Sequence, residues 1–176
     1  MDDDFLLNRG AVVACLASLR RFESTQINNM LMFIQNNRNI KELELLIMRQ
    51  AGRGVIKPQI RDEIVKTILY IKKSYQNEDE RVEKVKKFLG YVKWLYESLN
   101  MKSNRGADEQ EQNAEGNRGT AQQEQNAEGT QDSEEKQLRK AIEECYKLTF
   151  DTFVERIINQ NDPEQSQAKA TQTSNG

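Results

Sequence analysis

The chain has 176 residues, of which 36% are hydrophobic, so we expect one modest domain and a remainder that joins no core. The absence of histidine excludes histidine-based acid–base catalysis, Ser/His and Cys/His nucleophile pairs, and the commonest metal ligand. We therefore predict that the protein is not an enzyme and holds no metal and no cofactor. Cys15 and Cys145 lie in apolar, helix-patterned stretches, where buried free thiols are expected.

Charge is unevenly distributed along the chain. Residues 1–102 contain 18 Lys and Arg against 13 Asp and Glu, a net charge of +5, whereas residues 103–134 contain 2 against 8, a net charge of −6. The acidic start at residues 1–4 lacks the cationic region of a secretory signal, and the apolar run at residues 11–19 is too short to span a bilayer. We expect a soluble protein of the cytoplasm.

Apolar residues recur at helical spacing through the first part of the chain, which predicts an all-α fold. Ser24 or Thr25 would cap the second helix and Asn39 the third. Gly52 would end the third helix, and Pro58 suits the first turn of the fourth. The predicted compact bundle of about five helices covers residues 1–102, with helices over 11–22, 24–35, 40–52, 58–75 and 78–101.

The fifth predicted helix has an unusually broad apolar surface. It follows Asn77, which together with Glu80 resembles a capping box. Such a helix is expected to be central, or to bury a second side against a partner. Tyr91 and Trp94 lie beside its main apolar stripe, and we expect them to pack in the core, with stacking on nucleobases as the alternative.

The chain beyond the bundle is polar and repetitive. Residues 104–129 repeat a 13-residue unit without a large apolar residue. Because such a unit cannot bury surface, we predict a disordered acidic linker over residues 103–133. A further amphipathic helix is predicted over residues 134–160, before Pro163, and a disordered tail over residues 161–176.

A basic corner joins the third and fourth predicted helices. Cations recur there at every fourth position, at Arg49, Arg53, Lys57 and Arg61. Two glycines and a proline interrupt any single helix, so these cations belong to two helix ends and a loop. The planar guanidinium of arginine suits phosphate oxygens, and glycine permits a ligand to approach the protein backbone closely. These features favour binding to the phosphate backbone of a nucleic acid. The alternative is an ordinary helix end with solvated charges.

Three motifs occur in order along the chain. Ser24-Thr25-Gln26-Ile27 opens the second predicted helix, Gln50-Ala51-Gly52-Arg53 forms the corner, and Phe88-Leu89-Gly90-Tyr91-Val92-Lys93-Trp94-Leu95-Tyr96 lies in the fifth helix. In these motifs, residues 20–102 resemble the small, all-helical Csm-type subunit of type III CRISPR effector complexes. The chain departs from that pattern after Met101, because the family usually ends soon after the aromatic helix.

The resemblance implies a non-catalytic subunit of an antiviral defence ribonucleoprotein. Such subunits stack in several copies, contact other effector subunits, and hold the guide RNA–target RNA duplex by its backbone, with no membrane and no small-molecule substrate involved. Gln50 and Arg53 match the corner motif and Gln26 matches the helix-opening motif, so the resemblance makes them RNA-binding candidates. The local charge pattern adds Arg49, Lys57, Arg61 and Lys66.

Two other functions stay open. A helical scaffold or adaptor with no nucleic-acid role would bind protein partners through the broad fifth helix and the C-terminal helix, and its charges would be solvated. DNA binding by a helix-turn-helix over residues 40–73 fits less well. The connection at residues 52–57 is longer than the usual turn, and Asp62 and Glu63 occupy the start of the helix that would read bases.

Deletion of residues 104–129 should leave the thermal midpoint almost unchanged, because a disordered linker contributes no packing. Circular dichroism of the deleted and full-length chains measures this directly. A large loss of stability would show that the repeat packs against the bundle.

Overall fold

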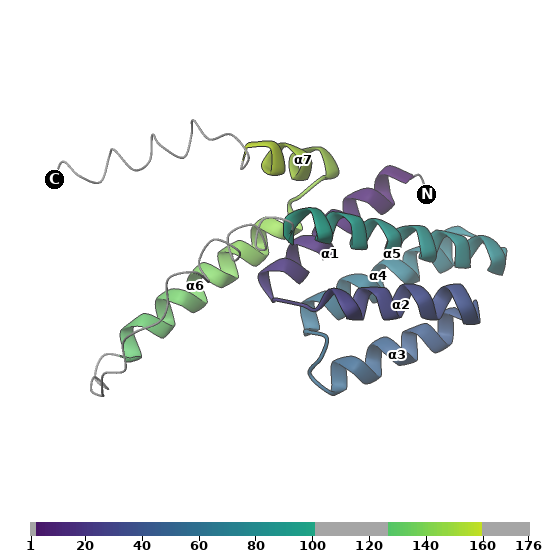
Figure 1. The fold of residues 1–176 in the computed structure, drawn as a ribbon, viewed down its shortest axis with the longest axis horizontal. Helices are drawn as coiled ribbons and strands as arrows, with labels where there is room; N and C mark the ends of the chain where they lie inside the picture. Colours follow the sequence, from purple (N-terminus) through teal and green to yellow (C-terminus); the bar gives the residue numbers. More distant parts are fainter. Residues whose placement is uncertain (1–2, 101–126, 160–176) are drawn as a thin grey trace, which may run out of the picture.

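The computed structural model describes residues 3–100 and 127–159, and over these residues the fold is all-α, as predicted (Figure 1). Among the described helices, none is long and apolar enough to cross a membrane. The predicted tail and most of the predicted linker lie outside the described residues. The helices are α1 (Asp3–Leu19), α2 (Ser24–Asn37), α3 (Ile40–Gly52), α4 (Pro58–Ser74), α5 (Glu78–Asn100), α6 (Ala127–Tyr146) and α7 (Phe150–Asn159).

The centre of the fold is α1, which packs against α4, α5, α6 and α7. Every residue from Gly10 to Ala17 is buried, so the helix is covered on all sides. The predicted start at residue 11 is therefore wrong, and Gly10 lies inside the helix. A Cβ at that position would lie 3.2 Å from the Tyr91 Cβ, so glycine permits the close crossing of α1 and α5.

The helices α2 to α5 run alternately in opposite directions beside one another (Figure 1). Their inward stripes follow the predicted helical spacing. Two predicted caps are confirmed: Asn39 Oδ1 accepts the Glu42 N–H at 3.2 Å, and Asn77 Oδ1 accepts the Asp79 N–H at 2.8 Å. The fully buried isoleucines of α4 are Ile60, Ile64, Ile68 and Ile71.

The predicted cap of α2 is wrong. Glu23 occupies the N-cap position and makes no side-chain cap hydrogen bond, while Ser24 already belongs to the helix. Thr25 instead donates its hydroxyl to the Glu23 carboxylate at 3.2 Å. The chain enters α2 from a tight turn at Arg21, whose φ is 49°, and the Tyr96 hydroxyl donates to the Phe22 carbonyl in that turn. Tertiary contact therefore fixes where α2 begins.

The single C-terminal helix predicted over residues 134–160 is two helices. The helix α6 begins at Ala127, inside the predicted linker, and α7 starts anew at Phe150. Thr149 lies at the break, and its hydroxyl accepts the Thr152 N–H at 3.3 Å, which favours a new helix start. The Phe150 N–H donates to Asn8 Oδ1 at 2.6 Å and attaches this start to α1.

A disulfide between Cys15 and Cys145 joins α1 to α6, with the two Cα atoms 5.6 Å apart. The prediction of free thiols is therefore wrong. Both cysteines are buried, as their apolar surroundings in the sequence indicate. Disulfides are rare in reducing compartments, so this bond argues against the predicted cytoplasmic location. The location itself stays a prediction.

A buried ion pair joins α1 to α4. Glu63 is 2% exposed, and its carboxylate pairs with the guanidinium of Arg9. Lys66, on the same helix as Glu63, adds a second cation at 3.2 Å. Burial lowers the pKa of the Arg9 guanidinium from its usual value. A carboxylate this deep requires a partner, because an unpaired buried charge is strongly destabilising.

Cys145→Ser should lower the free energy of unfolding by about 2–5 kcal/mol, because the disulfide restricts the unfolded chain. Urea unfolding with and without reductant measures the effect, and limited proteolysis of α6 and α7 reports whether they open locally. The variant is its own control, since its stability should not respond to reductant. If reductant does not change the free energy of unfolding of the wild-type chain, the disulfide does not stabilise the fold.

Arg9→Met should lower the free energy of unfolding by about 3–5 kcal/mol, because it leaves the Glu63 carboxylate buried beside Lys66 alone. The double variant Arg9→Met with Glu63→Met should recover most of that loss, because it removes both charges. Urea unfolding at neutral pH measures both effects. The matched control is Glu135→Gln, which breaks an exposed pair and should change stability little. If the double variant is no more stable than Arg9→Met, the loss of stability does not come from the unpaired Glu63 carboxylate.

Candidate nucleic-acid interface

The corner between α3 and α4 is a tight turn that closes on itself through backbone hydrogen bonds. The Gly54 N–H donates to the Ala51 carbonyl at 2.9 Å, and the Val55 N–H donates to the Gln50 carbonyl at 3.0 Å. Gly54 has a φ of 75°, in the left-handed region that favours glycine. Gly52 is the last residue of α3. The predicted end of the helix at Gly52 is therefore confirmed, and the chain reverses just after it, at Gly54.

The corner is anchored at both sides, although its middle is exposed. Ile56 is 1% exposed, so its side chain fixes the loop to the core. Lys57 occupies the N-cap position of α4, and Pro58 follows in the first turn, as predicted. Because these contacts fix the backbone of the loop, its exposed side chains extend from defined positions.

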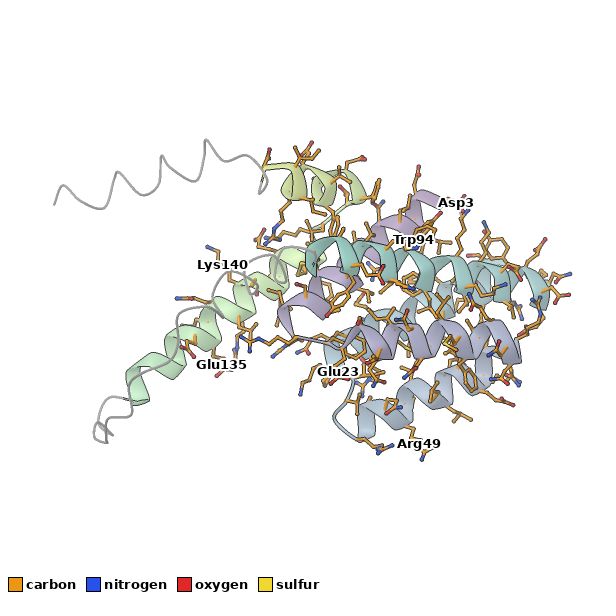
Figure 2. The ribbon with its side chains drawn as sticks, in the orientation of Figure 1. Asp3, Glu23, Arg49, Trp94, Glu135 and Lys140 are labelled. Carbon is orange, nitrogen blue, oxygen red and sulfur yellow. A yellow bond between two sulfur atoms is a disulfide. The ribbon has the colours of Figure 1, made fainter. Side chains whose placement is uncertain are left out.

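Three cations of the corner are exposed: Arg49, Arg53 and Lys57. Within the part of the chain that the structure describes, none of them makes an ion pair. Figure 2 shows Arg49 at the outer side of α3, directed away from the bundle. The corner therefore carries a local charge excess that no described carboxylate neutralises.

The other two predicted cations of this region are already paired. Arg61 donates from Nε to Asp62 Oδ1 at 2.8 Å and is half-buried. Lys66 pairs with the buried Glu63 at 3.2 Å. Pairing reduces what these side chains offer to a ligand, so the four regularly spaced cations of the sequence are not equivalent in the structure.

The two predicted glutamines occupy the same end of the bundle as the corner. Gln50 is half-buried, and its carbonyl accepts the N–H groups of Val55 and Ile56, so its backbone builds the turn. Gln26 is half-buried in the first turn of α2. Because α2 and α3 run in opposite directions, the start of α2 lies at the end where α3 terminates (Figure 1).

Trp94 is a candidate functional residue that the sequence pattern places in the core but the structure places at the surface. Its side chain is 65% exposed on α5, so the expectation of core packing is wrong for this residue, whereas Tyr91 is half-buried. The stripe that does face the core includes Phe88, Leu89 and Val92. Trp94 falls off that stripe, which is the sequence feature that could have indicated its exposure.

In comparisons with known proteins, no protein-family model matches this chain, and neither does a curated protein or a solved structure. The resemblance to the Csm-type subunit therefore depends on the three motifs alone.

Proposed function

We propose that the chain is a non-catalytic small subunit of a type III CRISPR ribonucleoprotein, stacking along the complex and holding the guide RNA–target RNA duplex by its backbone. The observation that carries the proposal is the corner's set of exposed, unpaired cations among the described residues, Arg49, Arg53 and Lys57. Two of these residues lie in or next to the Gln50–Arg53 motif on which the resemblance depends.

Electrostatics supports this use of the corner. Phosphate contacts dominate affinity for nucleic acid but carry no sequence information, as a complex that takes its specificity from base pairing requires. Arginine presents a planar fork that matches phosphate oxygens, which favours Arg49 and Arg53 over Lys57 as the main contacts. Since the described part of the corner places no carboxylate on these cations, phosphates would be their first anionic partners.

The small number of cations sets the expected strength of binding. Three contacts release few counterions, so one copy should bind weakly. Several copies aligned on one duplex would add their contacts through effective concentration. This is consistent with a subunit that acts in an assembly.

The adaptor alternative has an observation of its own. Two apolar side chains of α3, Leu45 and Met48, are 69% and 49% exposed. Exposed apolar residues on one helix suit a protein partner, but scattered ones are normal on any surface. They fit subunit contacts of the proposed assembly equally well, so they do not favour the adaptor over the proposed function.

Arg49→Ala and Arg53→Ala should each weaken binding to a 20-base-pair RNA duplex and lower the slope of log K against log salt by about one ion. The loss should be about equal for two unrelated sequences, because backbone contacts do not read bases. Fluorescence anisotropy at several salt concentrations measures both quantities.

The matched control is Lys41→Ala, which removes one exposed cation from the other end of α3 and should leave the slope almost unchanged. The proposal is wrong if duplex affinity does not depend on salt concentration, or if the double variant Arg49→Ala with Arg53→Ala binds the duplex as tightly as the wild type. Either result would favour the adaptor.

A further inference from the structure

An open groove lies between α2 and α5, away from the corner. We call it the α2–α5 groove; its volume is about 650 Å³, within the range of small-molecule and cofactor sites. Leu31 and Gln35 of α2 form one side. The α5 side includes Gly90, Tyr91, Trp94 and the lysines at positions 84, 86, 87 and 93.

The two ends of the groove differ in chemistry. At one end, the rings of Tyr91 and Trp94 lie with centroids 6.2 Å apart and planes inclined by 60°. Trp94 is 65% exposed, so a face of its indole is open to a ligand. Further along α5, the Lys87 ammonium lies 5.9 Å from the Tyr91 ring centroid. An aromatic surface with cations beside it resembles the arrangement that binds single-stranded nucleic acid.

Charges around the groove leave an excess of cations. Lys84 and Lys87 share one carboxylate, Asp3, at 3.2 and 2.6 Å. The hydrogen bond from Lys87, and then that from Lys84, lowers the pKa of Asp3, so it is an anion at neutral pH. Two ammonium groups on a single carboxylate retain one positive charge.

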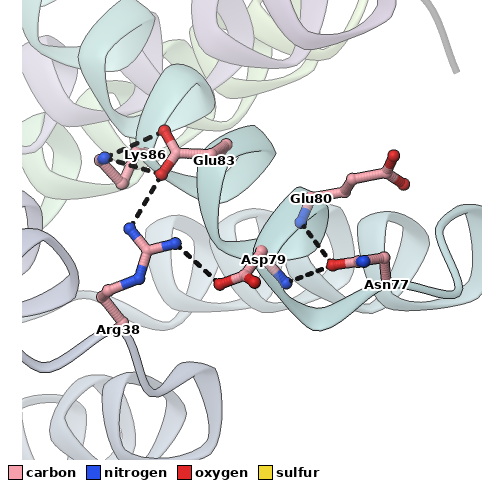
Figure 3. Close-up of polar contacts among 6 residues, drawn as sticks. All are labelled: Arg38, Asn77, Asp79, Glu80, Glu83 and Lys86. Atoms are coloured by element: carbon pink, nitrogen blue, oxygen red, sulfur yellow. Dashed lines mark hydrogen bonds and ion pairs between the residues drawn. The ribbon is translucent and has the colours of Figure 1, made fainter.

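The carboxylate that lines the groove is itself compensated. Glu83 accepts hydrogen bonds from both Lys86 and Arg38 at 3.0 Å, and Arg38 also contacts Asp79 at 2.9 Å (Figure 3). These bonds lower the pKa of Glu83, with Lys86 contributing most. An anionic ligand in the groove therefore meets no unpaired carboxylate among the described lining residues.

Gly90 keeps the middle of the groove open. It lies inside α5, where glycine is less favourable than alanine by about 1 kcal/mol. A Cβ built on Gly90 would meet no atom of a neighbouring element within 4 Å, so no packing contact requires glycine here. Because Gly90 lines the groove, a larger side chain at this position would extend into the groove.

We propose that the α2–α5 groove binds single-stranded nucleic acid, with an unpaired base stacked on Trp94 and the adjoining phosphate held by Lys84 and Lys87, which share one carboxylate. The aromatic end suits a base and the cationic end suits a phosphate. A groove for an amphipathic peptide helix would present a row of apolar pockets, whereas Leu31 is the one aliphatic residue among the described lining residues. This site goes beyond the proposed function and does not depend on it, because the corner belongs to α3 and α4.

Binding is measured with a ten-nucleotide single-stranded oligoadenylate RNA. Trp94 is the one tryptophan of the chain, so its emission reports on the groove without a label. We expect oligoadenylate to quench this emission, and the double variant Arg49→Ala with Arg53→Ala to retain the quenching. Quenching that disappears in the corner variant would assign the effect to the corner and overturn the groove site.

Two variants then test the groove by anisotropy of labelled oligoadenylate. Trp94→Ala should weaken binding about ten-fold through loss of stacking, and Trp94→Phe should recover part of the loss. Gly90→Leu should weaken binding to a similar extent by filling the groove, with a thermal midpoint that is unchanged or raised. Leu45→Ala, which truncates an exposed apolar side chain of α3, is the matched control and should bind as the wild type does.

Several outcomes would overturn the proposal. Wild-type affinity in folded Trp94→Ala or Gly90→Leu chains would exclude the groove as the binding site. No quenching by oligoadenylate at low salt would exclude it as well. If an acidic peptide quenches Trp94 while oligoadenylate does not, the groove belongs to a protein partner.

Discussion

The structure depends on the burial of α1 on all of its sides. From Gly10 to Ala17 the helix is buried throughout, and α4, α5, α6 and α7 all pack on it. Gly10 and the alanines of this stretch are small enough for neighbouring helices to approach closely. Because α1 also carries Cys15 and Arg9, it supplies one partner to both the disulfide and the buried ion pair. The helix thus connects the bundle to the C-terminal helices.

With the core organised around α1, the candidate binding surfaces lie on the other helices: the corner joins α3 to α4, and the groove lies between α2 and α5. The corner and the groove use cations differently. At the corner, Arg49 and Arg53 lie on a turn with no ion pair among the described residues, which suits contact with any phosphate backbone. In the groove, the lysines are held in place by Asp3 and Glu83, and Trp94 adds an aromatic surface. The proposed role of the corner needs phosphate contacts alone, whereas the proposed groove site adds stacking on a single base.

Much of the fold could be predicted because it depends on neighbours in sequence. The isoleucine stripe of α4, the Asn39 and Asn77 caps, and Pro58 in the first turn of α4 follow from spacing and side-chain chemistry over a few residues. Predictions failed where a local pattern had two readings. Ser24 and Thr25 both suited the N-cap of α2, but the turn at Arg21 places Glu23 there instead. The predicted start of α1 at residue 11 failed because Gly10 resembles a helix boundary, whereas in the structure this glycine lies inside the helix and permits the close approach of α5.

The sequence by itself determined the helical class, most inward stripes, the absence of histidine, and the basic residues between two helices. The tertiary structure alone decided which cations stay unpaired, that Trp94 faces outward, and that Cys15 meets Cys145 across 130 residues. The tertiary structure also decided that Glu63 of α4 is buried, which is possible because Arg9 of α1 pairs with it. The physical reason is that pairing and exposure depend on distances between segments far apart in the chain. Helical periodicity describes one segment at a time.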